Sequence, residues 1–210
     1  MNWNPAGMVE ELTSTSHKLA KGYETLQNME DVQLATTPKE LVWSSGHVKM
    51  YHYIRETPAK SKTPVLVSFA MLNRHDVLDL QPDRSLMKKL LEEGLDIYIM
   101  DWGYPTKADR YETMEDYIDG YMNDAVDFVR KSNKVDKIHK MGICQGGTFS
   151  MIYASLYPEK LKSLTTYVAP YEFSTNTCML YRWTKHIDVD AIVDSVGTVP
   201  GEMVDGAFGM

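Results

Sequence analysis

The chain has 210 residues and a net charge of −7, and its composition is 43% hydrophobic and 24% charged. These values are typical of one soluble globular domain with a sizeable core, and they give no indication of a basic face for nucleic acid. No window approaches the ~20 apolar residues that a membrane-spanning helix requires, and the N-terminus does not resemble a secretory signal. The two cysteines, Cys144 and Cys178, are not expected to form a disulfide, which favours a reducing, cytoplasmic location.

The first half of the chain predicts helices at its start and strands further on. Residues 8–30 carry apolar residues at helical spacing, and we expect one or two amphipathic helices that serve as a lid, a packing arm or a partner-binding segment. Residues 37–40 (TPKE) predict a turn or a helix start. Residues 48–54 alternate like a half-buried strand, and residues 64–70 (PVLVSFA) form an apolar run typical of a strand buried on both faces. Residues 84–93 predict a helix.

The second half alternates strands with helices. Residues 96–102 (DIYIMDW) predict another buried strand. Residues 113–131 predict a long amphipathic helix whose acidic start and basic end suit the helix dipole. Residues 138–144 predict a strand, residues 147–156 a helix and residues 161–169 a further strand. This order predicts an α/β fold with a mostly parallel sheet and helices on both faces.

The pattern becomes irregular after Tyr171, with short helical pieces such as residues 190–195. We therefore expect an N-terminal helical arm at residues 1–47 and a partial α/β core at residues 48–172. Residues 173–210 are expected to begin a cap or lid insertion, so that the fold is incomplete on its C-terminal side.

The stretch MGICQGG at residues 141–147 has the G-x-C-x-G pattern of the nucleophile elbow of an α/β-hydrolase, with cysteine in place of serine. Gly142, Gly146 and Gly147 allow the close backbone contacts of this sharp turn. The turn places Cys144 at a helix N-terminus, where the positive end of the dipole favours the thiolate. The alternative interpretation is a buried, inert cysteine in a glycine-rich turn.

An oxyanion hole in this fold needs two backbone N–H donors. We expect one from Gln145, which follows the nucleophile, and one from Leu72, in the loop after the strand at residues 64–70. Asn73 in the same loop either shapes the hole or bonds its own backbone.

No catalytic base is identifiable. The fold orders its triad as nucleophile, acid and base, and His186 alone among the six histidines follows Cys144. We expect His186 at the surface or at a helix cap, and His75 at a loop surface. No Cys/His spacing resembles a zinc site, and no glycine-rich phosphate loop is present. The chain thus carries a nucleophile without the base that typically contributes ~10²–10⁴-fold.

With these features the sequence resembles the catalytic subunit of polyhydroxyalkanoate synthase, most closely the two-component (class III) type. The resemblance covers nearly the whole chain. It rests on five motifs: LNR at 72–74, DRS at 83–85, DWGYP at 101–105, MGICQGG at 141–147 and PGE at 200–202. His75 departs from a proline that is frequent in the family, and residues 169–171 (APY) stand where Thr-Pro-Val is common.

The resemblance implies an acyltransferase that polymerises (R)-3-hydroxyacyl-coenzyme A into polyester. Cys144 would take the acyl group, and a histidine and an aspartate from later in the family's sequence would complete the triad, so that this chain corresponds to an N-terminal part. No cofactor is implied, since the coenzyme A thioester is the substrate. The implied partners are the growing polyester chain, a second (PhaE-like) synthase subunit, further copies of the chain and the surface of a cytoplasmic polymer granule.

Two alternatives stay open. The first is a cysteine-type hydrolase of the same fold that cleaves esters or lactones. The second is a non-catalytic fragment, or a natural half-subunit, that needs a complementing chain.

Overall fold

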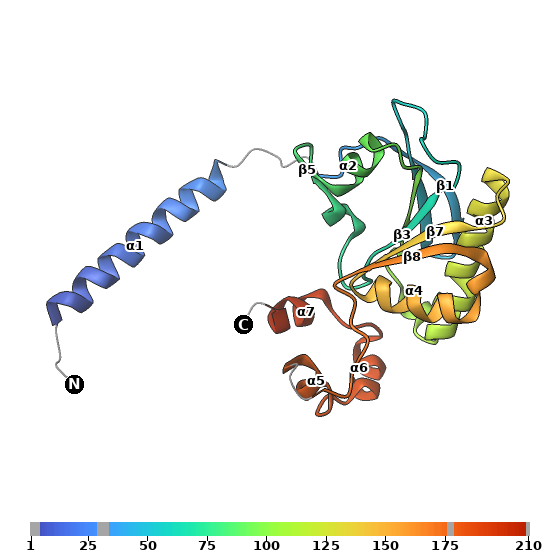
Figure 1. Cartoon of the computed structure of the whole chain (residues 1–210). Helices are drawn as coiled ribbons and strands as arrows, with labels where there is room; N and C mark the ends of the chain where they lie inside the picture. The colour runs from blue at the N-terminus through green and yellow to red at the C-terminus, as the bar shows by residue number, and fades with distance from the viewer. Residues whose placement is uncertain (1–4, 29–33, 176–178, 209–210) are drawn as a thin grey trace. The chain divides into compact units, whose positions relative to one another are not determined.

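The computed structural model describes residues 5–28, 34–175 and 179–208. Contacts within the chain divide it into two units, residues 1–34 and 35–210. The first unit contains helix α1 (Pro5–Gln27), whose apolar residues Leu12, Leu19 and Tyr23 are exposed. The helix expected at residues 8–30 is thus confirmed as one element that ends at Gln27, and residues 29 and 30 lie outside the described residues (Figure 1). No helix among the described residues is long and apolar enough to cross a membrane.

The second unit is built on a six-stranded sheet with the order β1-β2-β6-β3-β7-β8. Strands β1 and β6 pair antiparallel with β2, whereas β3 pairs parallel with both β6 and β7, and β7 pairs parallel with β8. The mostly parallel sheet of the predicted α/β fold is therefore confirmed. The strands are β1 (Lys39–Ser45), β2 (Val48–Tyr53), β3 (Val65–Ser68), β6 (Ile97–Asp101), β7 (Ile138–Ile143) and β8 (Leu161–Tyr167).

Helices cover both faces of this sheet (Figure 1). Alternate residues of a strand point to opposite faces, and the core follows this rule along β3. Leu66 packs in one cluster with α3 (Asn123–Asn133) and α4 (Gln145–Leu156), whereas Val65 and Val67 pack in the other with α2 (Leu86–Glu92). Because β3 is buried on both faces, its sequence is part of a continuous apolar run.

Strand β1 corrects the expectation of a turn or helix start at residues 37–40. Pro38 precedes the strand, and its carbonyl oxygen accepts the Ile54 N–H at 2.8 Å, which closes the end of the β1–β2 hairpin. Pairing with β2 therefore decides the conformation rather than the local turn signal. Strand β1 also lies within the range expected for the N-terminal arm, and the contact division falls earlier, between Leu34 and Ala35.

A small second sheet was not predicted. Strands β4 (Asp79–Gln81) and β5 (Arg84–Ser85) follow the 3₁₀ helix η1 (His75–Leu78). The helix expected at residues 84–93 begins two residues later, at Leu86, because the Ser85 hydroxyl accepts the Lys88 N–H at 2.9 Å and caps it.

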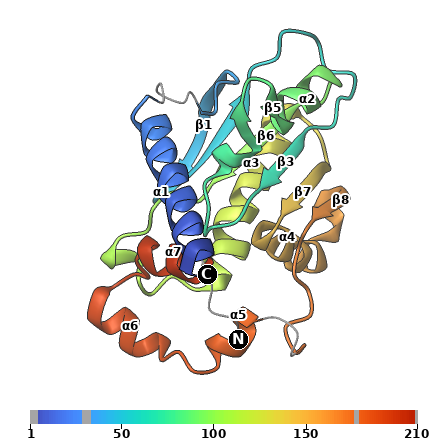
Figure 2. The ribbon, with the colours of Figure 1, turned by 90° about the vertical axis from the view of Figure 1, so that its left-hand side faces the viewer.

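Further helical segments complete the second unit. The helix expected at residues 113–131 begins as a π-helical segment (Asp116–Met122) and continues into α3. Short 3₁₀ helices span Lys107–Asp109 and Pro158–Lys160. The irregular C-terminal stretch forms three short helices at the same end of the structure (Figure 2): α5 (Met179–Thr184), α6 (Val189–Val196) and α7 (Gly201–Phe208).

Candidate active site

Cys144 lies between the end of β7 and the first residue of α4. Its backbone has φ +54° and ψ −130°, a conformation that is costly for a residue with a Cβ. Two hydrogen bonds hold it: the Cys144 N–H donates to the Tyr167 carbonyl at 2.9 Å, and its own carbonyl accepts the Gly147 N–H at 2.8 Å. This strand–turn–helix junction, with a strained residue at its apex, is the geometry of a nucleophile elbow.

The three elbow glycines stand where no side chain fits. A Cβ on Gly142 would lie 2.5 Å from the Gly147 Cα, and a Cβ on Gly147 would lie 2.4 Å from the Ala169 Cβ. A Cβ on Gly146 would lie 2.4 Å from the Ser68 carbonyl oxygen at the end of β3. The glycines thus let α4 approach the ends of β3 and β8 closely enough for the turn to form.

Replacing Gly146 with alanine is expected to destabilise the protein by ~1–3 kcal/mol or more, because the obstructing atoms are backbone and cannot swing away. Chemical denaturation measures the loss in the free energy of unfolding. Gly120→Ala is the matched control, because Gly120 lies in a helical segment and a Cβ at this position would meet no atom within 4 Å. That control is expected to be neutral or slightly stabilising, and equal effects of the two variants would contradict the account.

The loop after β3 is tied to the elbow by the side chain of Gln145. Its Oε1 accepts the Met71 N–H at 3.0 Å, so the Met71 donor is occupied and the next N–H along the loop is that of Leu72. Gly146 packs beneath the same loop against Ser68 and Phe69. The structure therefore brings Gln145 and the loop that carries Leu72 together. The Asn73 side chain accepts the neighbouring Arg74 N–H at 2.8 Å, which is the local role considered for it.

Replacing Gln145 with alanine is expected to slow the acyl transfer that the resemblance implies for Cys144 by ~10–100-fold, because the loop after β3 would no longer be bonded to the elbow and its N–H donors would shift. The free energy of unfolding should fall by only ~1–3 kcal/mol, the cost of an unpaired Met71 N–H. Timed assays of coenzyme A release measure the rate, and chemical denaturation curves measure the free energy of unfolding. Asn73→Ala is the control, since it removes a hydrogen bond within the loop and leaves the link to the elbow intact.

A cavity of about 640 Å³ adjoins this loop. Three segments line it: residues 69–75 in the loop after β3, residues 100–105 with the DWGYP motif, and residues 198–205 around the start of α7. Cys144 is not among the lining residues, although the loop that lines the cavity is bonded to the elbow through Met71 and Gln145. Its size falls in the range of small-molecule sites.

His75 is buried, which corrects the expectation of a loop-surface position. Its Nε2 lies 2.9 Å from the Lys39 Nζ, its Nδ1 lies 3.7 Å from an Asp101 carboxylate oxygen, and its ring stacks on Tyr51. Burial, followed by the positive charge of Lys39, lowers the pKa of His75. These partners belong to β1, β2 and β6, and Cys144 is not among them.

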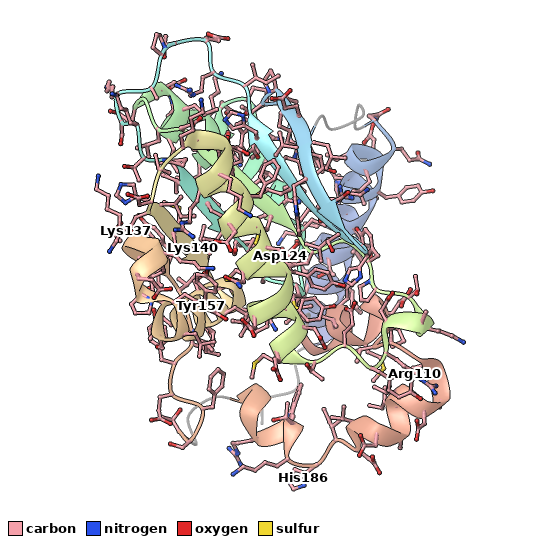
Figure 3. All side chains as sticks on the ribbon, turned by 90° about the vertical axis from the view of Figure 1, so that its right-hand side faces the viewer. Arg110, Asp124, Lys137, Lys140, Tyr157 and His186 are labelled. Carbon is pink, nitrogen blue, oxygen red and sulfur yellow. The ribbon has the colours of Figure 1, made fainter. Side chains whose placement is uncertain are left out.

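His186 lies on the exposed turn between α5 and α6, as expected (Figure 3). Asp188, two residues on, accepts the Ala191 N–H at 2.9 Å as the N-cap of α6, so its carboxylate serves the helix. Among the described residues no histidine hydrogen-bonds to Cys144. Cys178 lies outside the described residues, so its relation to Cys144 stays a prediction.

The strand that leads into the elbow contains a buried lysine that the sequence pattern did not predict. Lys140 of β7 is fully enclosed, and its Nζ donates to the Ser68 hydroxyl at 2.5 Å and towards the Leu66 carbonyl at 3.5 Å. Burial alone lowers its pKa to about 7. Lys137, just before the strand, is exposed and lies at the outside of the structure (Figure 3).

Comparison with known proteins agrees with this geometry. The family model of the α/β hydrolase fold matches residues 74–188, more than half of the chain, and the chain therefore belongs to the α/β hydrolase fold family. The solved structure of the Francisella virulence factor BioJ shares the fold, with a TM-score of 0.50 and 15% identity over 76% of this chain and 52% of that chain.

Within this fold the resemblance to the polyhydroxyalkanoate synthase catalytic subunit is confirmed. A model described as the poly-beta-hydroxybutyrate polymerase (PhaC) N-terminus matches residues 5–90. The chain is 40% identical over 206 residues to the poly(3-hydroxyalkanoate) polymerase subunit PhaC of Allochromatium vinosum, and 41% identical over 207 residues to that of Thiocystis violacea. The alignments cover 97% of this chain but only 58% of each relative, so the chain spans well under two thirds of their length.

Proposed function

We propose that this chain carries the nucleophile and oxyanion-hole part of a polyester synthase active site, which acts on (R)-3-hydroxyacyl-coenzyme A. The observation that supports this most is the placement of Cys144 at a strained elbow on the N-terminus of α4. A 12-residue helix directs its free N–H groups and the positive end of its dipole at the thiol.

The proposed reaction has two acyl transfers. The Cys144 thiolate attacks the thioester carbonyl, a new C–S bond forms, and coenzyme A leaves as its thiolate. The hydroxyl of a second hydroxyacyl group then attacks the Cys144 thioester, forming an ester and returning the cysteine. The exchange of one thioester for another is nearly balanced in free energy, whereas transfer to the hydroxyl runs downhill.

The backbone N–H groups of Gln145 and Leu72 are proposed to stabilise the oxyanion of both tetrahedral intermediates. The bond from Met71 to the Gln145 side chain supports this, because it fixes the loop against the elbow before any substrate arrives. No cofactor is proposed, because the thioester supplies the activated acyl group.

A histidine base and its aspartate partner are proposed to come from sequence outside these 210 residues. The relatives that match are considerably longer than this chain, and His75 and His186 are engaged elsewhere or exposed. By the same resemblance we propose a cytoplasmic, granule-associated enzyme that assembles with a second synthase subunit and with further copies of itself.

The test is incubation of the chain with 3-hydroxybutyryl-coenzyme A, with separate measurement of coenzyme A, free hydroxy acid and polymer. Because no histidine among the described residues hydrogen-bonds to Cys144, we expect slow release of no more than one equivalent of coenzyme A, with the acyl group retained on protein. Free 3-hydroxybutyrate as the main product would instead indicate a hydrolase. Release no faster than from a denatured control would indicate a non-catalytic fragment.

A further inference from the structure

A second cluster of titratable side chains adjoins the DWGYP segment, because the backbone of one member, His47, lies against Gly103. It joins His47, in the turn between β1 and β2, with Asp109 of the 3₁₀ helix Lys107–Asp109 and with Glu112 just after it. One potential ligand atom from each residue lies within 4.8 Å of the other two. We propose that these three residues form a binding site for a divalent transition-metal ion of the manganese or zinc type.

Two polar atoms of this cluster are buried without a partner. The His47 side chain is only 10% exposed and that of Glu112 only 18%. Among the described residues no group hydrogen-bonds to Glu112 Oε2 or to His47 Nδ1. Glu112 Oε2 faces His47 Nε2 at 3.7 Å, which is too long for a hydrogen bond. A buried carboxylate oxygen left in this state is costly, and a cation bridging it to the imidazole would satisfy it.

The remaining carboxylate oxygens are already held by neighbouring donors. The Tyr121 hydroxyl donates to Glu112 Oε1 at 2.6 Å. The Thr106 N–H and hydroxyl donate to Asp109 Oδ2 at 2.6 and 2.8 Å. Outer hydrogen bonds of this kind orient metal ligands and leave the second oxygen of each carboxylate for the ion.

The ligand set indicates the class of ion. One imidazole and two carboxylates suit borderline and hard first-row divalent ions, and the two negative charges balance a dication. Three ligand atoms ~2.0–2.2 Å from one ion lie ~3–4 Å apart from one another, so binding would draw the most widely separated atoms of the triad, now within 4.8 Å, together by up to ~1 Å. The contact of 3.2 Å between His47 Nε2 and the Tyr117 hydroxyl would be exchanged for the metal bond.

The site has an open, acidic approach. A cavity of about 480 Å³ is lined by Asp109 and Glu112 together with Asp116 and Asp124. Asp124 projects from the start of α3 (Figure 3). These carboxylates raise the local concentration of cations without belonging to the triad.

Binding would brace the wall of the larger cavity. A Cβ on Gly103 would lie 2.0 Å from the His47 carbonyl oxygen, so the turn that carries His47 directly supports the DWGYP segment. Asp109 and Glu112 lie in the loop that follows the DWGYP segment. An ion that bridges them to His47 would therefore hold this loop against the β1–β2 turn. The site is therefore proposed as structural, and it does not depend on the proposed reaction.

Titration of the metal-free chain with Mn²⁺ alone, followed by calorimetry and by electron paramagnetic resonance, tests the site. We expect one saturable equivalent and a higher midpoint of thermal unfolding when the ion is bound. Glu112→Gln and Asp109→Asn are expected to weaken binding by at least ~10-fold. Asp116→Asn and Asp124→Asn, which remove the same charge from the cavity wall, should retain it.

Glu112→Gln keeps an oxygen that can accept the Tyr121 hydroxyl. Its midpoint of thermal unfolding in the presence of a chelator should therefore match that of the parent chain. This comparison distinguishes a loss of metal binding from a loss of folding. His47→Gln is the second variant, since it removes the imidazole ligand. Absence of saturable binding by the parent chain would overturn the proposal. Equal weakening by all four carboxylate variants would also overturn it, because the acidic cavity would then bind ions only diffusely.

Discussion

Replacing Cys144 with alanine is expected to reduce coenzyme A release from 3-hydroxybutyryl-coenzyme A to the rate seen without protein. The thiol is the proposed acyl acceptor, and loss of a nucleophile typically costs ~10³-fold or more in a complete site. Colorimetric or chromatographic detection of free coenzyme A measures the effect. The fold should persist, because Cys144 is half-buried and the glycines that shape the turn remain.

Two further variants sharpen this prediction. Cys178→Ser removes the other thiol of the sequence and should leave the release rate unchanged. Cys144→Ser should be as inactive as the alanine variant, because a hydroxyl needs an adjacent base whereas a thiol is partly ionised unaided. If Cys178→Ser abolished coenzyme A release while Cys144→Ala retained it, the nucleophile would be Cys178, and the prediction would be contradicted.

Replacing Lys140 with methionine is expected to stabilise the protein markedly below neutral pH. Burial lowers the pKa of Lys140 from its ordinary 10.5 to about 7. Below pH 7 the lysine is charged in both folded and unfolded chains, and the folded chain carries the full cost of the buried charge. Between pH 7 and 10.5 only the unfolded chain is protonated, so the free energy of unfolding rises with pH.

The expected gain at pH 6 is on the order of 3–5 kcal/mol, from ~1.4 kcal/mol per unit of pKa shift, less about 1 kcal/mol for the lost bond to Ser68. At pH 10 the gain should be much smaller. Denaturant titrations at both values measure it. Lys137→Met, at an exposed position of the same segment, is the control and should leave the pH dependence unchanged. An unchanged pH dependence in Lys140→Met would contradict the assignment.

The elements that the sequence predicts best are those whose local pattern and tertiary environment agree. Strands β3 and β6 are buried on both faces, and their apolar runs record that burial directly. The elbow was predictable because its glycines are demanded by backbone contacts between β3, β7 and α4, and glycine has few other reasons to recur at that spacing.

The features that escaped prediction depend on distant partners. Strand β1 follows a proline-containing segment whose local sequence predicts a turn, and it becomes a strand because it pairs with β2. The burial of His75 arises from Lys39, Tyr51 and Asp101, which lie on three strands far from it in sequence. The cluster of His47, Asp109 and Glu112 likewise has no fixed spacing that a motif would record.

Cys144 is the proposed acyl acceptor. Mass spectrometry of the folded chain after incubation with 3-hydroxybutyryl-coenzyme A, followed by digestion and fragment mapping, tests it most directly. We predict one hydroxybutyryl group per chain, attached to Cys144 through a thioester that hydroxylamine removes. A folded chain that stays unmodified, or that carries the acyl group on another residue, would contradict the account.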